Sequence, residues 1–350
     1  MSNSHPAIVG LDVGGANLKA WHAGGQALAI PFALWKSPQE LSSQIAAMLQ
    51  QLPAADRVVV TMTGELADCF ATRAEGVEFI VRAVEQAVRS VLPDSIIQFW
   101  QTHGKFVAPN DAVASPLLTA ASNWQALASM VGLLFPQDDL LLLDIGSTTT
   151  DLIPILQGQA SAEGRTDLER LAAGELVYTG VRRTVVCHML PSFQGELGRY
   201  GHVSIPLSSE LFATSLDVYL LLGLIEEEPE NCETADGRPA TKEFAEARLA
   251  RQICSDQSEL TTHDVIKLAM AAAAAQQQQI VQATRRVINC ASRPIKKIVL
   301  SGSGEFLGRQ VAVQACFPME EILSLKDYWT TAGSEVACAR ALVELALQGF

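Results

Sequence analysis

The hydrophobic pattern of the chain contains two stretches built on the same plan. In residues 138–155, four leucines lead into Asp144, a turn of glycine, serine and threonines follows, and a second apolar run starts at Asp151. Such an apolar run is typical of a strand buried on both faces, and the polar turn predicts that the second run pairs with the first as a hairpin. In residues 7–22 an apolar strand again ends in an acid, Asp12, followed by two glycines and a second strand. The chain therefore predicts two similar hairpins about 130 residues apart.

Strands and helices alternate through the rest of the chain. The apolar spacing predicts strands at 27–34, 57–61, 95–100, 159–162 and 297–300, and a strand with flanking loops within 176–188. It predicts helices at 38–52, 76–92, 113–131, 212–225, 242–252, 261–288 and 335–347. Residues 226–241, rich in Glu, Pro, Asp and Gly, predict a mobile surface loop. The alternation predicts an α/β protein with a first domain at 1–137 and a second at 138–350.

Length and composition agree with two globular domains and limit the partners. The 350 residues are 49% hydrophobic and 18% charged, and the net charge is −13. An acidic chain lacks the basic surface that nucleic acids require, so an anionic substrate must be held by local donors. The seven cysteines are scattered and predict reduced thiols. Without a signal peptide or a membrane-spanning run, we expect a cytoplasmic monomer or homodimer with small-molecule substrates and no membrane partner.

The two turns carry groups that suit phosphate and a metal ion. Free backbone N–H groups and hydroxyls can donate to phosphate oxygens, and the candidates are Gly14, Gly15, Asn17, Gly146, Ser147, Thr148 and Thr149. Asp12 and Asp144 are the expected ligands of a hydrated Mg²⁺, because hard cations prefer oxygen. Lys19 is either a further cation for the phosphates or a solvated surface lysine. An ordinary hairpin with a polar tip is the alternative for each stretch taken alone.

A third glycine-rich turn follows the strand at 297–300. Gly302 and Gly304 lie between this strand and a predicted helix, where glycine allows a close backbone approach and a helix start favours anions. Alone, this is equally well a plain strand–helix turn. Together, the three turns resemble those of the superfamily of acetate and sugar kinases, heat-shock chaperone ATPases and actin. The resemblance implies a two-domain actin-like ATPase (ribonuclease H-like) fold, in which each domain is a mixed sheet with flanking helices and a cleft lies between them.

Six blocks narrow the resemblance to one branch of that superfamily: TMTGELADCF (61–70), ASNW (121–124), DIGSTTTDLIPI (144–155), ELVYTGVRRT (175–184), ATSLDVYLLLG (213–223) and ADGRPAT (235–241). They resemble the hydantoinase/oxoprolinase-related family found with the tetrahydromethanopterin-linked one-carbon pathway. Its members include the synthase that joins the furan and aryl halves of methanofuran. The resemblance implies a Mg²⁺-dependent transferase, in which the phenol of a tyramine or tyrosine conjugate attacks an aminomethylfuran-methyl diphosphate and releases pyrophosphate.

Such a reaction requires a base for the phenol and recognition of the acceptor. Asp151 is the first candidate base, with Glu65 and Asp68 next; alternatively, Asp151 only bonds its own turn. Arg182 and Arg183 either bind carboxylates of a glutamyl-bearing acceptor or form surface salt bridges.

Two other functions remain open from the sequence. An ATP-dependent small-molecule kinase or ATPase would use the same superfamily fold, and a non-catalytic, nucleotide-responsive partner protein would use it without chemistry. The presence of both acids and both glycine turns disfavours the non-catalytic alternative.

Overall fold

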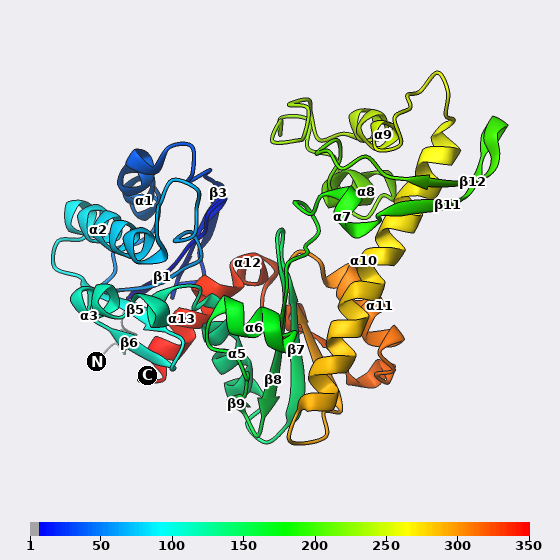
Figure 1. Cartoon of the computed structure of the whole chain (residues 1–350). Coiled ribbons are helices and arrows are strands. Elements are labelled where there is room, and N and C mark those ends of the chain that lie inside the picture. The colour runs from blue at the N-terminus through cyan, green and yellow to red at the C-terminus, as the bar shows by residue number, and fades with distance from the viewer. Residues whose placement is uncertain (1–6) are drawn as a thin grey trace.

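A computed structural model describes residues 7–350 and contains two mixed β-sheets, each flanked by helices (Figure 1). The first sheet has the strand order β3-β2-β1-β4-β5-β6. Its strands are β1 (Ile8–Val13), β2 (Asn17–His22), β3 (Ala27–Pro31), β4 (Arg57–Met62), β5 (Ile96–Gln101) and β6 (Lys105–Val107). β1 pairs antiparallel with β2 and parallel with β4, so the first predicted hairpin is confirmed.

One face of the first sheet is covered by helices α1 and α2. The helices of this half are α1 (Leu41–Leu49), α2 (Arg73–Val91), α3 (Pro109–Ala114) and α4 (Pro116–Thr119). The buried faces of α1 and α2 pack with Val9, Leu11 and Val13 of β1 in one apolar core. Alternation along β1 explains this arrangement, because neighbouring side chains point to opposite faces of the sheet.

The second sheet repeats the hairpin. Its order is β10-β8-β7-β13-β14, with β9 paired to β8. Its strands are β7 (Asp139–Ile145), β8 (Thr150–Leu156), β9 (Gln159–Ala160), β10 (Leu176–Val177), β13 (Lys297–Ser301) and β14 (Ile322–Ser324). Helices α10 (Thr262–Cys290) and α11 (Glu305–Gln314) contribute to the core on one face of this sheet. Helix α10 begins with a capping box, in which Thr261 and Asp264 satisfy each other's backbone N–H groups.

Two helices, α5 (Asn123–Leu134) and α13 (Ala337–Leu347), join the sheets. They share one apolar cluster with Ile8 and Val59 of the first sheet and Leu140 of the second. Helix α13 approaches β1 so closely that a Cβ on Gly10 would lie 2.0 Å from the carbonyl oxygen of Ala339. The sequence assigned α13 to the domain 138–350, but in space the helix packs against the first sheet.

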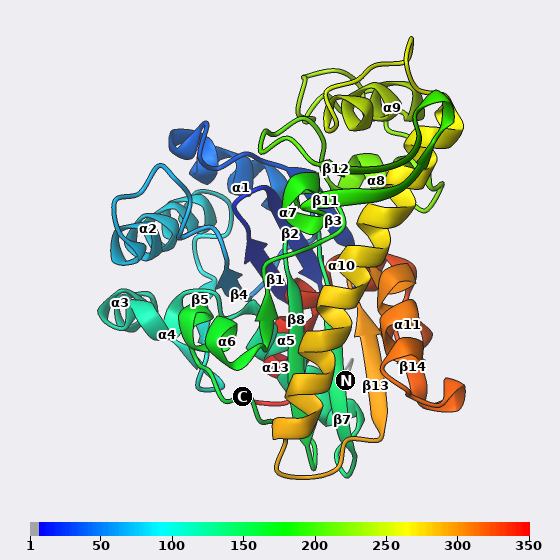
Figure 2. The same ribbon diagram turned by 45° about the vertical axis from the view of Figure 1, so that its right-hand side comes forward.

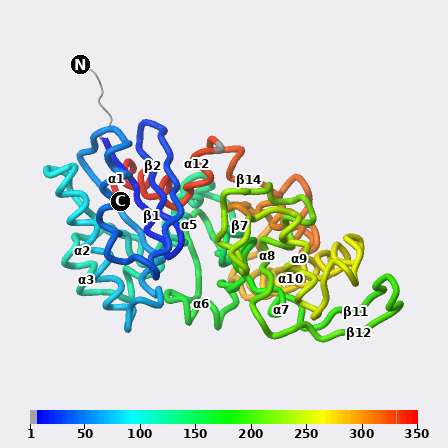
Figure 3. Tube along the Cα trace, turned by 90° about the horizontal axis from the view of Figure 1, so that it is seen from above, coloured from blue at the N-terminus to red at the C-terminus, as the bar shows by residue number. Residues whose placement is uncertain are grey.

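A third group of elements extends beyond the second sheet, as Figures 1, 2 and 3 show from three sides. It consists of α7 (Val186–Met189), β11 (Ser192–Leu197), β12 (Gly201–Pro206), α8 (Ser215–Leu221) and α9 (Lys242–Arg251). Strands β11 and β12 pair only with each other, forming a ribbon that projects from the molecule (Figure 1). Shorter elements are α6 (Asp167–Ala173), α12 (Thr331–Glu335) and 3₁₀ helices Pro38–Glu40, Gly198–Tyr200, Met319–Glu321 and Leu325–Asp327.

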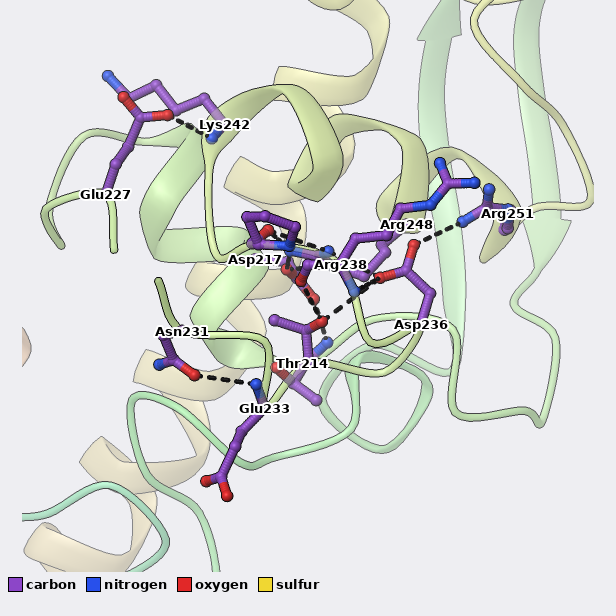
Figure 4. Close-up of polar contacts among 12 residues, drawn as sticks. Thr214, Asp217, Glu227, Asn231, Glu233, Asp236, Arg238, Lys242, Arg248 and Arg251 are labelled. Carbon is purple, nitrogen blue, oxygen red and sulfur yellow. Dashed lines mark hydrogen bonds and ion pairs between the residues drawn. The ribbon is translucent and has the colours of Figure 1, made fainter. Parts of the chain in front are cut away.

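The loop predicted at 226–241 is present and is anchored by a buried ion-pair cluster (Figure 4). The guanidinium of Arg248 is fully buried and lies 2.7 Å from Asp217 of α8 and 2.9 Å from Asp236 of the loop. The Asp217 carboxylate also accepts from the backbone N–H of Thr214 at 2.9 Å. Buried charges persist only when they are paired, so these contacts hold the loop against α8 and α9.

One helix prediction was wrong. Residues 113–131 do not form one helix, because Pro116 interrupts the pattern and Ala121 has a φ of 46°, outside helical geometry. The strand predicted within 176–188 is present at Leu176–Val177, and the segment ends in the short helix α7. The ribbon of β11 and β12 was not predicted. Within residues 7–350, no helix is both long and apolar enough to cross a membrane.

Candidate functional site

The first hairpin ends in a tight turn beside Asp12. The backbone N–H of Gly14 donates to the carbonyl of Asn17 at 3.0 Å, closing the turn. A loop packs on it, since the N–H of Leu34 donates to the carbonyl of Gly15 at 2.9 Å. Lys19 lies directly opposite Asp12 in the β1–β2 pairing. The turn therefore presents backbone donors, an acid and a lysine together.

The second hairpin has the same construction. The N–H of Gly146 donates to the carbonyl of Thr149 at 2.9 Å, and the Ser147 and Thr148 hydroxyls lie 3.4 Å apart. The segment after β10 covers the outer side of this turn. There the N–H groups of Arg182 and Arg183 both donate to the carbonyl of Ser147 at 3.0 Å. These bonds fix the turn while its hydroxyls stay partly exposed.

The third turn adjoins the second hairpin. Gly302 has a φ of +86°, and a Cβ there would lie 2.6 Å from the Asp144 carboxylate and 2.3 Å from the carbonyl of Ile145. The N–H of Gly304 donates to that same carbonyl at 2.9 Å, just before α11 begins. Glycine is required at Gly302, because a side chain would collide with the acid and would be strained at this φ.

Asp12 lies near the end of β1 and Asp144 near the end of β7, and both acids are buried carboxylates with perturbed pKa values. Burial raises the pKa of Asp12, while the charge of Lys19 lowers it. Burial raises the pKa of Asp144 to about 7, and the charge of Asp151 adds to the increase. A hydrogen bond with Ser301 and the charge of Lys19 oppose it. The buried thiol of Cys338 has its pKa raised by burial and by both acids. The charges of Asp12 and Asp144 both act on Cys338, and the charge of Lys19 acts on both acids, so the two acids are electrostatic neighbours.

These two carboxylates fit a hydrated Mg²⁺. The Oδ1 of Asp12 is enclosed and has no hydrogen-bond partner within residues 7–350. A buried, unpaired carboxylate oxygen is costly unless a cation or a proton neutralises it. The described residues hold no cluster of three or more acidic, His or Cys side chains suited to a metal. Water would have to complete the shell, as is common for Mg²⁺.

Asp151, the first candidate base, is held in an ion pair. It is buried, and its Oδ1 accepts from the guanidinium of Arg170 at 2.5 Å. Arg170 is itself buried and stacks on Trp124, with 4.3 Å between its Cζ and the ring centroid. The Arg170 guanidinium already occupies this carboxylate, and a buried pair of this kind holds α6 against β8. This geometry favours a structural role for Asp151.

The other two candidate bases differ in burial. Glu65 is 1% exposed, and its Oε2 has no hydrogen-bond partner in the described part of the chain. Burial raises the pKa of Glu65 to about 7, opposed by backbone donors and by Arg73. Asp68 lies on the surface. Arg73 pairs at 3.7 Å with Asp167 of the second domain, and the charge of Asp167 also raises the pKa of Glu65.

The two arginines of the VRR segment have different partners. Arg182 forms a double ion pair with Glu228 of the 226–241 loop, at 2.5 and 3.1 Å. This arginine therefore forms the salt bridge that the sequence left open. The Arg183 guanidinium is exposed, has no ion pair within residues 7–350, and lies 4.9 Å from the ring centroid of Trp35. This contact links the two domains beside the phosphate turns.

Sequence reasoning missed Arg170 and Trp35. Arg170 belongs to a helix with a clear capping box, yet nothing in its neighbourhood signals that an arginine there is buried. Trp35 lies in a loop, and its partner comes from the other domain. The aromatic residues Phe32 and Trp35 after the first hairpin were the available signal.

Paired hairpins on two mixed sheets define the class of actin-like two-domain proteins. The hydantoinase/oxoprolinase family matches residues 56–346, and the chain belongs to this family. A "(4-{4-[2-(gamma-L-glutamylamino)ethyl]phenoxymethyl}furan-2-yl)methanamine synthase" from Methanocaldococcus jannaschii is 37% identical over 267 residues, 75% of this chain and 76% of that protein. A Methanococcus vannielii protein with the same name is 33% identical over 200 residues, 57% of this chain and 85% of that protein. The predicted resemblance to aryl-ether-forming synthases, and the prediction of an enzyme, are confirmed.

Solved structures share the fold at low identity. The nucleotide-free structure of acetone carboxylase has a TM-score of 0.50 and 11% identity, covering 96% of this chain and 69% of that one. An archaeal actin homologue has a TM-score of 0.44 and 13% identity, covering 98% of this chain and 100% of that one. The predicted α/β, two-domain actin-like fold is confirmed.

Proposed function

We propose that this protein is a Mg²⁺-dependent transferase of methanofuran or methylofuran biosynthesis. It joins an aminomethylfuran-methyl diphosphate to the phenol of a tyramine or tyrosine conjugate and releases pyrophosphate. The similarity to the Methanocaldococcus jannaschii synthase carries this proposal, because the product in that name contains a phenoxymethyl link between an aryl ring and a furan. The two glycine turns beside Asp12 and Asp144, and the third turn packed against Asp144, support it.

In this reaction the phenolic oxygen forms a bond to the furan methylene carbon. The bond between that carbon and the diphosphate oxygen breaks, and its electron pair leaves with the diphosphate. The phenolic proton passes to a base. Negative charge builds on the leaving group, so donors aimed at its oxygens accelerate the step.

The chain supplies those donors from the two hairpins. In this proposal Gly15, Asn17 and the hydroxyls of Ser147, Thr148 and Thr149 bind and orient the diphosphate. Gly14, Gly146 and Gly304 shape the turns, because their N–H groups donate to backbone carbonyls, and Gly302 lies beside them. Asp12 and Asp144 would hold Mg²⁺, which, when bound, stabilises the charge on the leaving oxygens. Lys19 adds a positive charge that acts on both acids. It forms no ion pair within residues 7–350.

Glu65 replaces Asp151 as the base in this proposal. Its carboxyl is enclosed, its Oε2 has no partner among residues 7–350, and burial raises its pKa to about 7. A base with a pKa near the working pH transfers protons most effectively. Asp151 has a structural role in this proposal, since its ion pair with Arg170 joins α6 to the strand that follows the second turn.

The second candidate is an ATP-dependent small-molecule kinase or ATPase. The observation that favours it is the glycine turn at 302–304 before α11, whose sequence resembles the superfamily's adenosine turn. Both candidates share the phosphate turns and the acids. Cytoplasmic location and a monomeric or homodimeric state remain predictions.

One assay separates the candidates. Purified protein is incubated with Mg²⁺, the furan diphosphate and a glutamyl-tyramine or tyrosine acceptor, and pyrophosphate and the ether product are measured. Pyrophosphate release that requires the acceptor supports the transferase. If no pyrophosphate is released and phosphate is transferred from ATP instead, the result contradicts the transferase and supports the kinase. Asp144→Asn is the control for turnover at this cleft.

A further inference from the structure

The contact between Arg183 and Trp35 places a cation on an aromatic ring, and both groups can bind a ligand. Arg183 Cζ lies 4.9 Å from the Trp35 ring centroid, and the two residues come from different domains. Their backbones are tied to the two phosphate turns. The N–H of Arg183 donates to the carbonyl of Ser147 at 3.0 Å, and Leu34, beside Trp35, donates to the carbonyl of Gly15 at 2.9 Å. The pair therefore lies beside both turns.

Stacking leaves the hydrogen-bonding edge of Arg183 free. A guanidinium that lies on an aromatic ring uses its face, while its N–H donors point outward in the plane. No carboxylate pairs with it within the described part of the chain, and its side chain is exposed. Arg182, by contrast, is occupied by Glu228. In a chain of net charge −13, an arginine without a carboxylate partner is suited to an anionic ligand.

We propose that Arg183, held on Trp35, binds the carboxylate of the acceptor and thereby selects acceptors that carry one. This inference rests on the proposed function, in which the diphosphate occupies the turns and the acceptor enters beside them. A planar guanidinium binds a carboxylate through two parallel hydrogen bonds, whereas a neutral carboxamide cannot accept both. Trp35 orients the guanidinium and offers an apolar face to the aryl ring.

The test compares two acceptors that differ in one group. One is a glutamyl-tyramine with a free carboxylate, and the other is the matching carboxamide. Arg183→Gln should raise KM for the carboxylate acceptor about ten- to a hundredfold and leave KM for the carboxamide and for the diphosphate unchanged. Arg183→Lys should recover part of the loss, because lysine supplies the charge without the paired donors.

Lys36 is the matched control. It is an exposed cation whose Nζ lies 5.9 Å from the centroid of the same Trp35 ring. Lys36→Gln should leave both acceptors unaffected. Arg199→Gln removes another exposed arginine, stacked on Tyr200 at 5.0 Å in the projecting ribbon, and should also have no effect. Equal losses for both acceptors in Arg183→Gln, or an unchanged KM, would overturn the inference.

Direct binding separates this inference from the proposed reaction. Calorimetry with each acceptor and no diphosphate measures recognition without turnover. Tighter binding of the carboxylate acceptor, lost in Arg183→Gln, supports the inference even if no pyrophosphate is released. Equal binding of the two acceptors to the unaltered protein contradicts it, whatever the activity.

Discussion

The guanidinium of Arg170 lies 2.5 Å from the carboxylate of Asp151, and both side chains are at most 10% exposed. This pair connects α6 to the strand that follows the second phosphate turn. Because a buried guanidinium already occupies this carboxylate, the geometry favours a structural role for Asp151 over that of a base. The pair also makes the two roles of Asp151, base or structural partner, experimentally separable.

We expect Asp151→Asn to destabilise the protein by about 3–5 kcal/mol, because it leaves Arg170 as an unpaired buried charge. The kcat of the molecules that remain folded should be retained. Urea unfolding and kcat, measured on the same sample, test this. Glu85→Gln, which breaks the exposed pair with Arg82 at 2.9 Å, should cost at most about 1 kcal/mol. Loss of kcat by about a hundredfold or more with unchanged stability would restore Asp151 as the base.

Glu65→Gln should lower kcat by about 10²- to 10⁴-fold, because a glutamine cannot accept the phenolic proton. KM for the diphosphate should not change. Asp68→Asn alters an exposed acid in the same loop and should have little effect on kcat. Steady-state kinetics of both variants decide the point, and a larger loss for Asp68→Asn than for Glu65→Gln would contradict it.

The raised pKa of Glu65 also predicts how stability varies with pH. The folded pKa of about 7 exceeds the model-compound value of 4.5, so the folded state binds a proton more tightly than the unfolded state. The stability from this proton is fully present below about pH 4.5 and is lost as pH rises through about 7. Glutamine stays neutral at both pH values. The free energy of unfolding of Glu65→Gln should therefore fall by about 3 kcal/mol less than that of the parent protein between them. The free energy of unfolding of both proteins, measured in EDTA across this pH range, tests the difference. Parallel curves of stability against pH would disprove it.

Mg²⁺ binding should weaken below the pKa of Asp144. The ion binds the ionised carboxylate, and the pKa of that group is about 7 without metal. The apparent affinity should therefore fall by up to about tenfold for each pH unit below 7. The increase in Tm on adding MgCl₂ should be larger at about pH 8 than at about pH 6. Asp144→Asn should abolish the response, and a response independent of pH would show that Asp144 does not bind the ion.

Gly302→Ala should be more damaging than an alanine at another left-handed glycine. Its Cβ would lie 2.3 Å from the carbonyl of Ile145 and 2.6 Å from the Asp144 carboxylate. Gly237 has a comparable φ of +70° with no atom within 4 Å of its Cβ, so Gly237→Ala should cost only about 1–2 kcal/mol of backbone strain. Thermal unfolding and the Mg²⁺-induced increase in Tm compare the two variants. Equal effects on both quantities would show that the third turn does not position Asp144.

Local patterns predicted the hairpins because all their determinants lie within a few consecutive residues. The apolar runs, the acids and the glycine turns are neighbours in sequence, and so β1 with β2 and β7 with β8 could be predicted. The helix predicted at 113–131 was wrong, since apolar periodicity alone gave too little weight to Pro116.

Contacts between distant segments could not be predicted in this way. Arg170 and Asp151 pair across 19 residues, and the choice between base and structural partner depended on that pair. Trp35 and Arg183 meet only because the two domains do. Burial raises the pKa of Glu65, and burial depends on packing that a local pattern does not contain.

The close fit of α13 against Gly10 affects how the chain can be made. Helix α13 follows every strand of the second sheet in the chain, yet it covers β1 in the first. The second sheet is therefore synthesised before α13, and the face of β1 that α13 covers stays exposed until α13 has been made. Although each half has its own sheet, the first half therefore completes its packing only after the whole chain has been synthesised.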